Sequence, residues 1–250
     1  MKIYLYGAVP EEVTESEAPK MEAKIGDQKA RIELFNHDGI GFLYSKVDLG
    51  SKLRATRRNV QNHSETLGDL LEKTETLAPV SFGAILDDLD SVKKIIEENR
   101  EDLQTTLDRI ANKVEYGVKA YWDPDEVAQK VGENDKEVQK LKKKVQSGKV
   151  GNQYEATVEV GELIDEKIED KKEELRESIL KHLTPVSQEW VENDLFDERM
   201  AANLAFLLKR NSQEDFDSAM QELGKDHPGY LTFKYNGPWP PFNFVEMELG

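Results

Sequence analysis

The C-terminal end of the chain limits its fold more than any other segment does. Residues 230–244 have the sequence YLTFKYNGPWPPFNF, and six of the fifteen are aromatic, against 8% of the whole chain. Proline fixes the backbone angle φ and lacks an amide donor, so the three prolines exclude a helix or a central strand here. We therefore predict a stiff, extended segment that carries the side chains of Trp239, Phe242 and Phe244.

This segment has two candidate roles, and the sequence leaves both open. Rigid aromatic side chains on a pre-organised backbone suit docking, because little conformational entropy is lost on binding. They can dock between the domains of their own chain or on a partner. We expect Trp239 to pack against the N-terminal part, and Phe242 and Phe244 to be better placed for contact outside the chain. We assign partner or interdomain docking to Pro238, Trp239, Pro240, Phe242 and Phe244.

Composition and charge restrict the class of partner. The chain has 250 residues, enough for one large or two small domains, and a formal net charge of −16. So acidic a chain is a poor match for nucleic acid or an anionic membrane surface. No apolar run approaches the ~18 residues of a membrane span, and the first residues lack the apolar region of a signal peptide. The absence of cysteine excludes disulfide and thiolate chemistry, which fits a reducing cytoplasm.

The first 111 residues fit an N-terminal α+β domain. Alternating or apolar runs predict strands at 2–8, 21–25, 30–35, 40–47 and 77–84, and an acidic loop covers 9–19. Apolar stripes at helical spacing predict one helix after Ser51 and another over 85–111. His63 falls on the apolar face of the first helix, which favours a core histidine over a functional one.

Residues 112–236 fit a second domain of ferredoxin-like order. Apolar and polar residues alternate from Val114 to Trp122, which indicates a half-buried strand. Residues 123–184 contain 28 charged residues and predict two charged helices, at 126–146 and 161–183. Strands at 186–195, 200–209 and 230–235 and a helix at 212–223 complete the order βαββαβ. We predict a two-domain α+β protein: 1–111, then 112–236 with a helical insertion at about 123–184, then a tail at 237–250 that packs back on the body.

The sequence contains no catalytic, cofactor or metal motif specific enough to nominate a residue. Gly39-Ile-Gly41 sits in a hairpin context and lacks the third glycine of a dinucleotide fingerprint. None of the four histidines has a second His or Cys at metal-ligand spacing. The lysine run at 140–144 is typical of a charged helix face. We expect no catalysis, no cofactor and no metal, which favours binding or assembly.

The run from Tyr235 to Val245, YNGPWPPFNFV, resembles the C-terminal signature of the gas vesicle protein F/L family (GvpF/GvpL). Three further segments agree with that family in order and character: the opening strand IYLYG at 3–7, HSETL at 63–67 followed by LAPVSFG at 77–83, and KVEYGVKAY at 113–121. One departure is Ser81, which stands where the family usually has arginine, so a role that needs a cation there is not carried over.

The resemblance implies an accessory or minor structural protein of gas vesicles, the hollow protein shells that give prokaryotic cells buoyancy. It implies two α+β domains, the second a modified ferredoxin-like fold, and a location at the gas vesicle within the cytoplasm. It also implies binding to the small hydrophobic shell subunit and to other gas vesicle proteins, without catalysis. The alternatives are a resident of the shell and an enzyme or small-ligand-binding protein of ferredoxin-like architecture.

Overall fold

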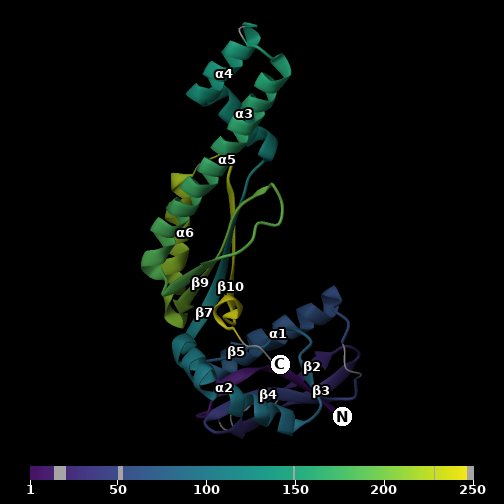
Figure 1. The fold of residues 1–250 in the computed structure, drawn as a ribbon. Coiled ribbons are helices and arrows are strands. Elements are labelled where there is room, and N and C mark those ends of the chain that lie inside the picture. The colour runs from purple at the N-terminus through teal and green to yellow at the C-terminus, as the bar shows by residue number, and fades with distance from the viewer. Residues whose placement is uncertain (14–20, 50–52, 149, 228, 247–250) are drawn as a thin grey trace. The chain divides into compact units, whose positions relative to one another are not determined.

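The computed structural model describes residues 1–13, 21–49, 53–148, 150–227 and 229–246. The chain divides into two compact units (Figure 1). The first unit contains residues 1–116, 207–210 and 237–250, and the second contains residues 117–206 and 211–236. Both units mix helices with antiparallel sheet, as expected for an α+β protein. The predicted boundary near residue 111 and the separate tail remain predictions about folding units.

The first unit is built on one antiparallel sheet in the order β2-β3-β4-β1-β5, with β6 also paired to β1. In the register of β1 and β4, Tyr4 lies opposite Ser45 and Leu5 lies opposite Tyr44. The predicted early strands are confirmed, although the loop at 14–19 lies outside the described residues. The strands are β1 (Lys2–Pro10), β2 (Glu22–Ile25), β3 (Gln28–His37), β4 (Ile40–Val47), β5 (Ala78–Pro79) and β6 (Ile85–Leu86).

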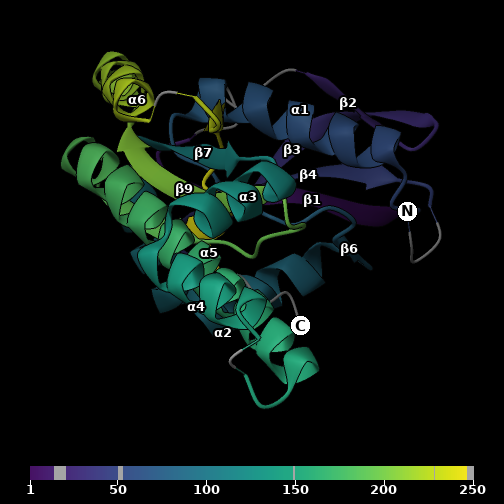
Figure 2. The same cartoon turned by 90° about the horizontal axis from the view of Figure 1, so that it is seen from above.

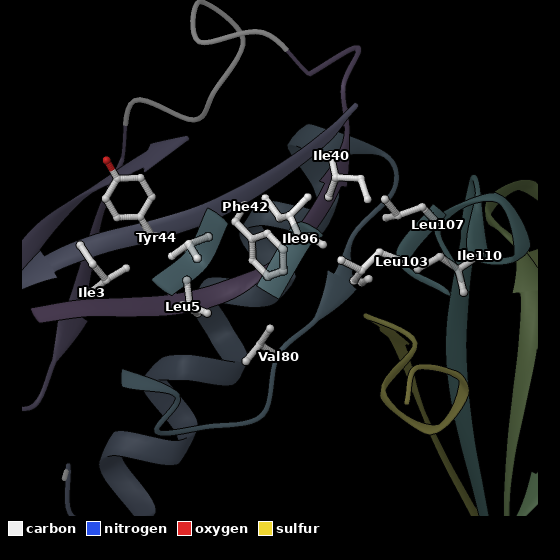
Figure 3. Close-up of a cluster of buried hydrophobic side chains, with 13 residues drawn as sticks. Ile3, Leu5, Ile40, Phe42, Tyr44, Val80, Ile96, Leu103, Leu107 and Ile110 are labelled. Atoms are coloured by element: carbon white, nitrogen blue, oxygen red, sulfur yellow. The ribbon is translucent and has the colours of Figure 1, made fainter. Parts of the chain in front are cut away.

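Two helices cover this sheet, because both faces of β1 are apolar enough to be buried. Successive side chains of a strand point to opposite faces, so Ile3 and Leu5 share one face while Tyr4 and Tyr6 share the other. Helix α2 (Leu89–Ile110) packs on the Leu5 face, where the core cluster of Figure 3 lies. Helix α1 (Arg57–Thr74) packs on the tyrosine face, and Figure 2 shows it running over the strands.

The sequence-based boundaries between α1 and α2 are wrong. The strand expected at 77–84 is reduced to Ala78–Pro79, and Ile85–Leu86 pairs with β1 instead of opening a helix. Helix α2 begins only at Leu89, because the Asp88 carboxylate accepts the Ser91 amide at 2.9 Å and caps the helix. A cap competes with the apolar periodicity that suggested an earlier start.

The second sheet has the strand order β10-β7-β9-β8. Helices α3 and α4 pack beside the long helix α5, and α6 packs on α5 as well (Figure 1). The strands are β7 (Lys113–Tyr121), β8 (Glu189–Glu192), β9 (Met200–Lys209) and β10 (Thr232–Trp239). The helices are α3 (Pro124–Asn134), α4 (Lys136–Gln146), α5 (Gln153–Leu183) and α6 (Gln213–Asp226), with short 3-10 turns η1 (Thr184–Val186) and η2 (Arg210–Ser212).

Local capping explains two of the departures from prediction in this region. The single helix expected at 126–146 is two helices, because Asp135 leaves the helical backbone and accepts the amides of Glu137 and Val138 at 2.9 and 3.0 Å. Helix α5 begins at Gln153 after Asn152, so Gly161 lies inside it and not at its start. Helix α6 likewise continues through Gly224 to Asp226. Among the residues described, none of the helices has both the length and the apolar character needed to cross a bilayer.

Candidate functional site

The C-terminal segment, defined here as residues 237–246, belongs to the first unit. The strand expected at 230–235 continues through Pro238 to Trp239. This is compatible with proline because β10 is an edge strand, where a missing amide breaks no inner ladder. A single 3-10 turn, η3 (Phe242–Phe244), follows, and in it the Phe242 and Phe244 amides donate to the carbonyls of Pro240 and Pro241 at 2.8 and 3.1 Å.

Gly237 allows the segment to approach β7 closely. Its φ of +151° lies in the range that favours glycine. A Cβ at this position would stand 2.7 Å from the Glu115 carbonyl oxygen and 2.8 Å from Cδ1 of Tyr116. Neither distance is tolerable for a carbon atom, so no other residue fits without moving the backbone of β7 or of the segment.

A buried carboxylate on β7 holds the middle of the segment. Glu115 is only 6% exposed and accepts the Asn243 backbone amide at 2.8 Å and the Asn243 side-chain amide at 2.6 Å. Burial raises the pKa of Glu115, and the two hydrogen bonds from Asn243 oppose that shift in part. Sequence alternation assigned Glu115 to the polar face of its strand, so its burial corrects that expectation. Removing a carboxylate from water is costly unless it accepts hydrogen bonds. The burial of Glu115 therefore favours the geometry of the segment in which both amide groups of Asn243 reach it.

Two further contacts fix the end of the segment. The Arg109 guanidinium donates to the Phe244 carbonyl, and the Phe244 side chain is 2% exposed. Val245 packs against the core cluster beneath α2. No local pattern in the sequence marks Arg109 or Glu115 as anchors, because each is more than a hundred positions from its partner.

The aromatic residues predicted to dock are therefore not equivalent. Trp239 and Phe242 keep 38% and 37% of their surface exposed, and Pro238 is exposed, whereas Pro240 is buried. Phe244 lies buried within the first unit, which contradicts the expectation that its ring contacts something outside the chain. The docking role itself stays a prediction for all five residues.

His63 lies in a second polar cluster of the first unit, and its surroundings give it a structural role. Its Nε2 lies 3.0 Å from the Val80 carbonyl and must be the protonated nitrogen, so its Nδ1 accepts the Tyr4 hydroxyl at 2.9 Å. Burial lowers the pKa of His63 and raises that of Tyr4 to about 12. The Tyr6 hydroxyl bonds Ser45 at 3.0 Å, and Ser45 donates to a backbone carbonyl. The expectation of a core histidine is confirmed.

This buried cluster has no arrangement suited to catalysis. The neutral ring of His63 uses both nitrogens in bonds to the protein, and the two tyrosines hold their protons at any ordinary pH. Phe82 closes the cluster with an edge contact to the His63 ring, with centroids 5.8 Å apart. Ser81, next to it in the chain, is exposed.

The fold matches that of gas vesicle proteins whose structures are solved. The chain superposes on the crystal structure of GvpF from Anabaena sp. PCC7120 with a TM-score of 0.86 and 23% identity, covering 99% of each chain. For GvpF from Microcystis aeruginosa the TM-score is 0.82 and the identity 24%, covering 98% of this chain and 99% of the other. An α+β protein of the GvpF fold is thus the class that the structure defines.

The chain belongs to the gas vesicle synthesis protein GvpL/GvpF family, whose model matches residues 2–246. Two of its relatives are gas vesicle protein F of Dolichospermum flosaquae and gas vesicle protein F1 of Halobacterium salinarum (strain ATCC 700922 / JCM 11081 / NRC-1). The first is 25% identical over 248 residues, which cover 98% of each chain. The second is 26% identical over 250 residues, which cover 99% of this chain and 94% of the relative. The resemblance seen in the sequence is confirmed, and the chain is a gas vesicle protein.

Proposed function

We propose that this protein takes part in gas vesicle assembly by binding the small hydrophobic shell subunit and other gas vesicle proteins, without catalysis. Family membership supplies the setting, a gas vesicle inside a prokaryotic cell. The observation that carries the binding role is the exposure of Trp239 and Phe242 on a backbone that Glu115 and Arg109 hold in place. We place the protein at the gas vesicle, within the cytoplasm.

Docking through these two rings has a physical rationale. An apolar shell subunit exposes surface that aggregates before assembly unless something covers it. Aromatic side chains supply a large apolar contact at a small entropic cost when their backbone is already ordered. A net charge of −16 on the carrier keeps a complex with an apolar subunit in solution.

We also propose that the second sheet with its helices is a modified ferredoxin-like fold. The elements follow one another as β7, helices, β8, β9, α6 and β10. The spatial order β10-β7-β9-β8 places the first and third strands of this set in the middle and the fourth and second at the edges. The chain order is that of the split βαβ motif, and helices α3 to α5 form the insertion.

Small-ligand binding remains the second candidate, because the second unit holds a cavity of about 470 Å³ along α3 and α5. Lys130, Lys167 and Asp170 are among its lining residues, and Lys130 Nζ lies 4.4 Å from the centre of the Tyr230 ring. The lysines already have acidic partners: Lys130 lies 2.7 Å from Glu126, and Lys167 lies 3.1 Å from Glu137. The partner carboxylate raises the pKa of Lys167, so this lysine stays charged and is no general base near neutrality. The pairing of these two lysines with carboxylates therefore gives no support to catalysis at this cavity.

The binding proposal is tested by co-expressing the shell subunit with the full chain and capturing the latter. We expect a Trp239→Ala/Phe242→Ala variant to recover at least about tenfold less shell subunit, because loss of two anchoring aromatics weakens an interface by more than ~1.4 kcal/mol. Phe244 is left unchanged because its burial would confuse binding with stability. Unfolding curves check that the variant is folded.

The matched control replaces two exposed aromatics of the second unit, Tyr154 and Phe196, which are 77% and 73% exposed. A Tyr154→Ala/Phe196→Ala variant should recover as much shell subunit as the wild type. Equal losses in both variants would show non-specific adhesion, and no loss in either would remove the docking role of the C-terminal segment. Washing isolated vesicles with denaturant then separates a transient carrier, which is released early, from a resident of the shell.

A further inference from the structure

Three side chains of the kinds that bind metals meet at one end of the first sheet. His37 ends β3, Asp38 follows it in the turn to β4, and Glu97 lies on α2. His37 Nε2 is 3.1 Å from Glu97 Oε1 and 3.5 Å from Asp38 Oδ2, and the three ligand atoms all lie within 4.8 Å of one another. Glu97 follows His37 by 60 positions along the chain, so no sequence spacing indicates the cluster.

These separations suit a shared metal ion. Zinc binds imidazole nitrogen and carboxylate oxygen at ~2.0–2.2 Å, which puts tetrahedral ligands about 3.4 Å apart. The distances from Nε2 to the two carboxylate oxygens already bracket that value. A neutral imidazole can offer one N–H to one of the two carboxylates, whereas a divalent cation satisfies both together with the ring nitrogen.

The backbone around the cluster is fixed by contacts that do not involve the three ligand atoms. Asp38 has a φ of +48° in the turn, and its carbonyl accepts the Arg100 Nε–H of α2 at 3.0 Å. The Phe35 ring stacks on His37 with centroids 6.4 Å apart. The residue before Glu97 is Ile96, a fully buried member of the core cluster. The ligands therefore stand on ordered elements on both sides of the site.

We propose that His37, Asp38 and Glu97 bind a divalent transition-metal ion, of which Zn²⁺ is the best match. One nitrogen and two oxygens are donors that Zn²⁺ accepts readily, whereas Mg²⁺ and Ca²⁺ select all-oxygen sites. Three protein ligands leave a position for water or for a group from another molecule. Lys93, whose Nζ is 3.6 Å from Glu97 Oε1, is the cation that the metal would displace. The ion would tie the β3–β4 turn to α2 and stabilise the folded state that it binds.

The test is calorimetric titration of the untagged, metal-free full chain with Zn²⁺. We expect one saturable site and a rise in the midpoint of thermal unfolding on adding the metal. His37→Gln, Asp38→Asn and Glu97→Gln should each weaken binding by at least about tenfold. Asparagine suits position 38 because it tolerates positive φ. Each variant is checked for an unchanged midpoint in the absence of metal.

The matched control is His182→Gln. His182 Nε2 also lies 3.1 Å from a carboxylate, that of Asp226, but the described residues place no second carboxylate of that kind beside it. This variant should bind Zn²⁺ as the wild type does. Absence of saturable binding by the wild type, undiminished binding by His37→Gln, or loss of binding by His182→Gln would each overturn the proposal. None of these results bears on capture of the shell subunit, so the two proposals stand or fall separately.

Discussion

The carboxylate of Glu115 accepts both amide groups of Asn243, the backbone N–H at 2.8 Å and the side-chain Nδ2 at 2.6 Å, from a position 128 residues earlier in the chain. This pair joins the beginning of β7 to the C-terminal segment. It sets where the exposed rings of Trp239 and Phe242 are held, because both lie within four residues of Asn243.

Removing the carboxylate should release the segment. We expect Glu115→Ala to lower the free energy of unfolding by about 1–3 kcal/mol, since two amide donors lose a buried acceptor. Hydrogen exchange should become faster at Asn243 in the variant. Glu101→Ala, at an exposed position on α2, is the control and should change neither quantity. Unchanged exchange at Asn243 in Glu115→Ala would mean that Arg109 and the apolar contacts suffice to hold the segment.

The raised pKa of Glu115 predicts how stability depends on pH. Above the ordinary glutamate pKa of 4.5, the unfolded state has lost the proton while the folded state still holds it. The folded state therefore loses stability as pH rises from that value through the raised pKa, and the penalty is complete above it. Glutamine cannot ionise, so Glu115→Gln does not lose this stability. Its free energy of unfolding should therefore rise relative to that of the wild type as pH increases over the same window. Urea unfolding at a series of pH values measures the difference, and a difference that does not vary with pH refutes this prediction.

His63 predicts the opposite dependence on the acid side of neutrality. Burial lowers the pKa of His63 in the folded state below its ordinary value of 6.5. The unfolded state then binds a proton first as pH falls, so the stability present above 6.5 is lost as pH falls through the lowered pKa. His63→Gln should flatten this part of the stability profile, while lowering the overall free energy of unfolding through the lost contact with Tyr4. A profile that keeps the wild-type slope below pH 6.5 would assign the effect to another histidine.

Two glycine substitutions should act in opposite directions. Gly237→Ala should destabilise the chain by at least about 1–3 kcal/mol, because an alanine there is strained at φ +151° and meets Glu115 and Tyr116 at less than 3 Å. Gly161→Ala should stabilise it by ~0.5–1 kcal/mol, because that site is inside α5 and a Cβ meets nothing within 4 Å. Thermal unfolding compares both with the wild type. A neutral Gly237→Ala would show that the close approach of the segment to β7 is not required.

Local patterns in the sequence predicted many elements well. The alternation in β1 and β7 and the apolar stripe of α1, including the inward position of His63, were visible because side-chain direction follows the backbone period. The cap of α3 has a local basis too, since Asp123 stands just before Pro124 and accepts two amides of the first turn. Capping also caused two errors: Asp88 and Asp135 each begin a helix inside a segment that the sequence assigned to a single helix.

The candidate site followed from the sequence only in part. The prolines and aromatic residues of the C-terminal segment indicated a stiff docking element, and family membership gave it a setting. Which rings stay exposed was decided by tertiary contacts, which bury Phe244 and leave Trp239 and Phe242 about 38% and 37% accessible. The sequence also did not indicate that His37 and Glu97 converge, because they are 60 positions apart and neither stands out among the polar surface residues of the chain.

By itself the sequence determined the α+β class, the strand and helix periods, and the gas vesicle family. These depend on neighbours within a few positions, or on a signature run that stays contiguous. Only the tertiary structure decided that Glu115 is buried, that Asn243 satisfies it, and that Gly237 admits the segment against β7. The physical reason is that burial and hydrogen-bond partnership arise between residues far apart in the chain, and the cost of removing a charge from water is set by what surrounds it after folding.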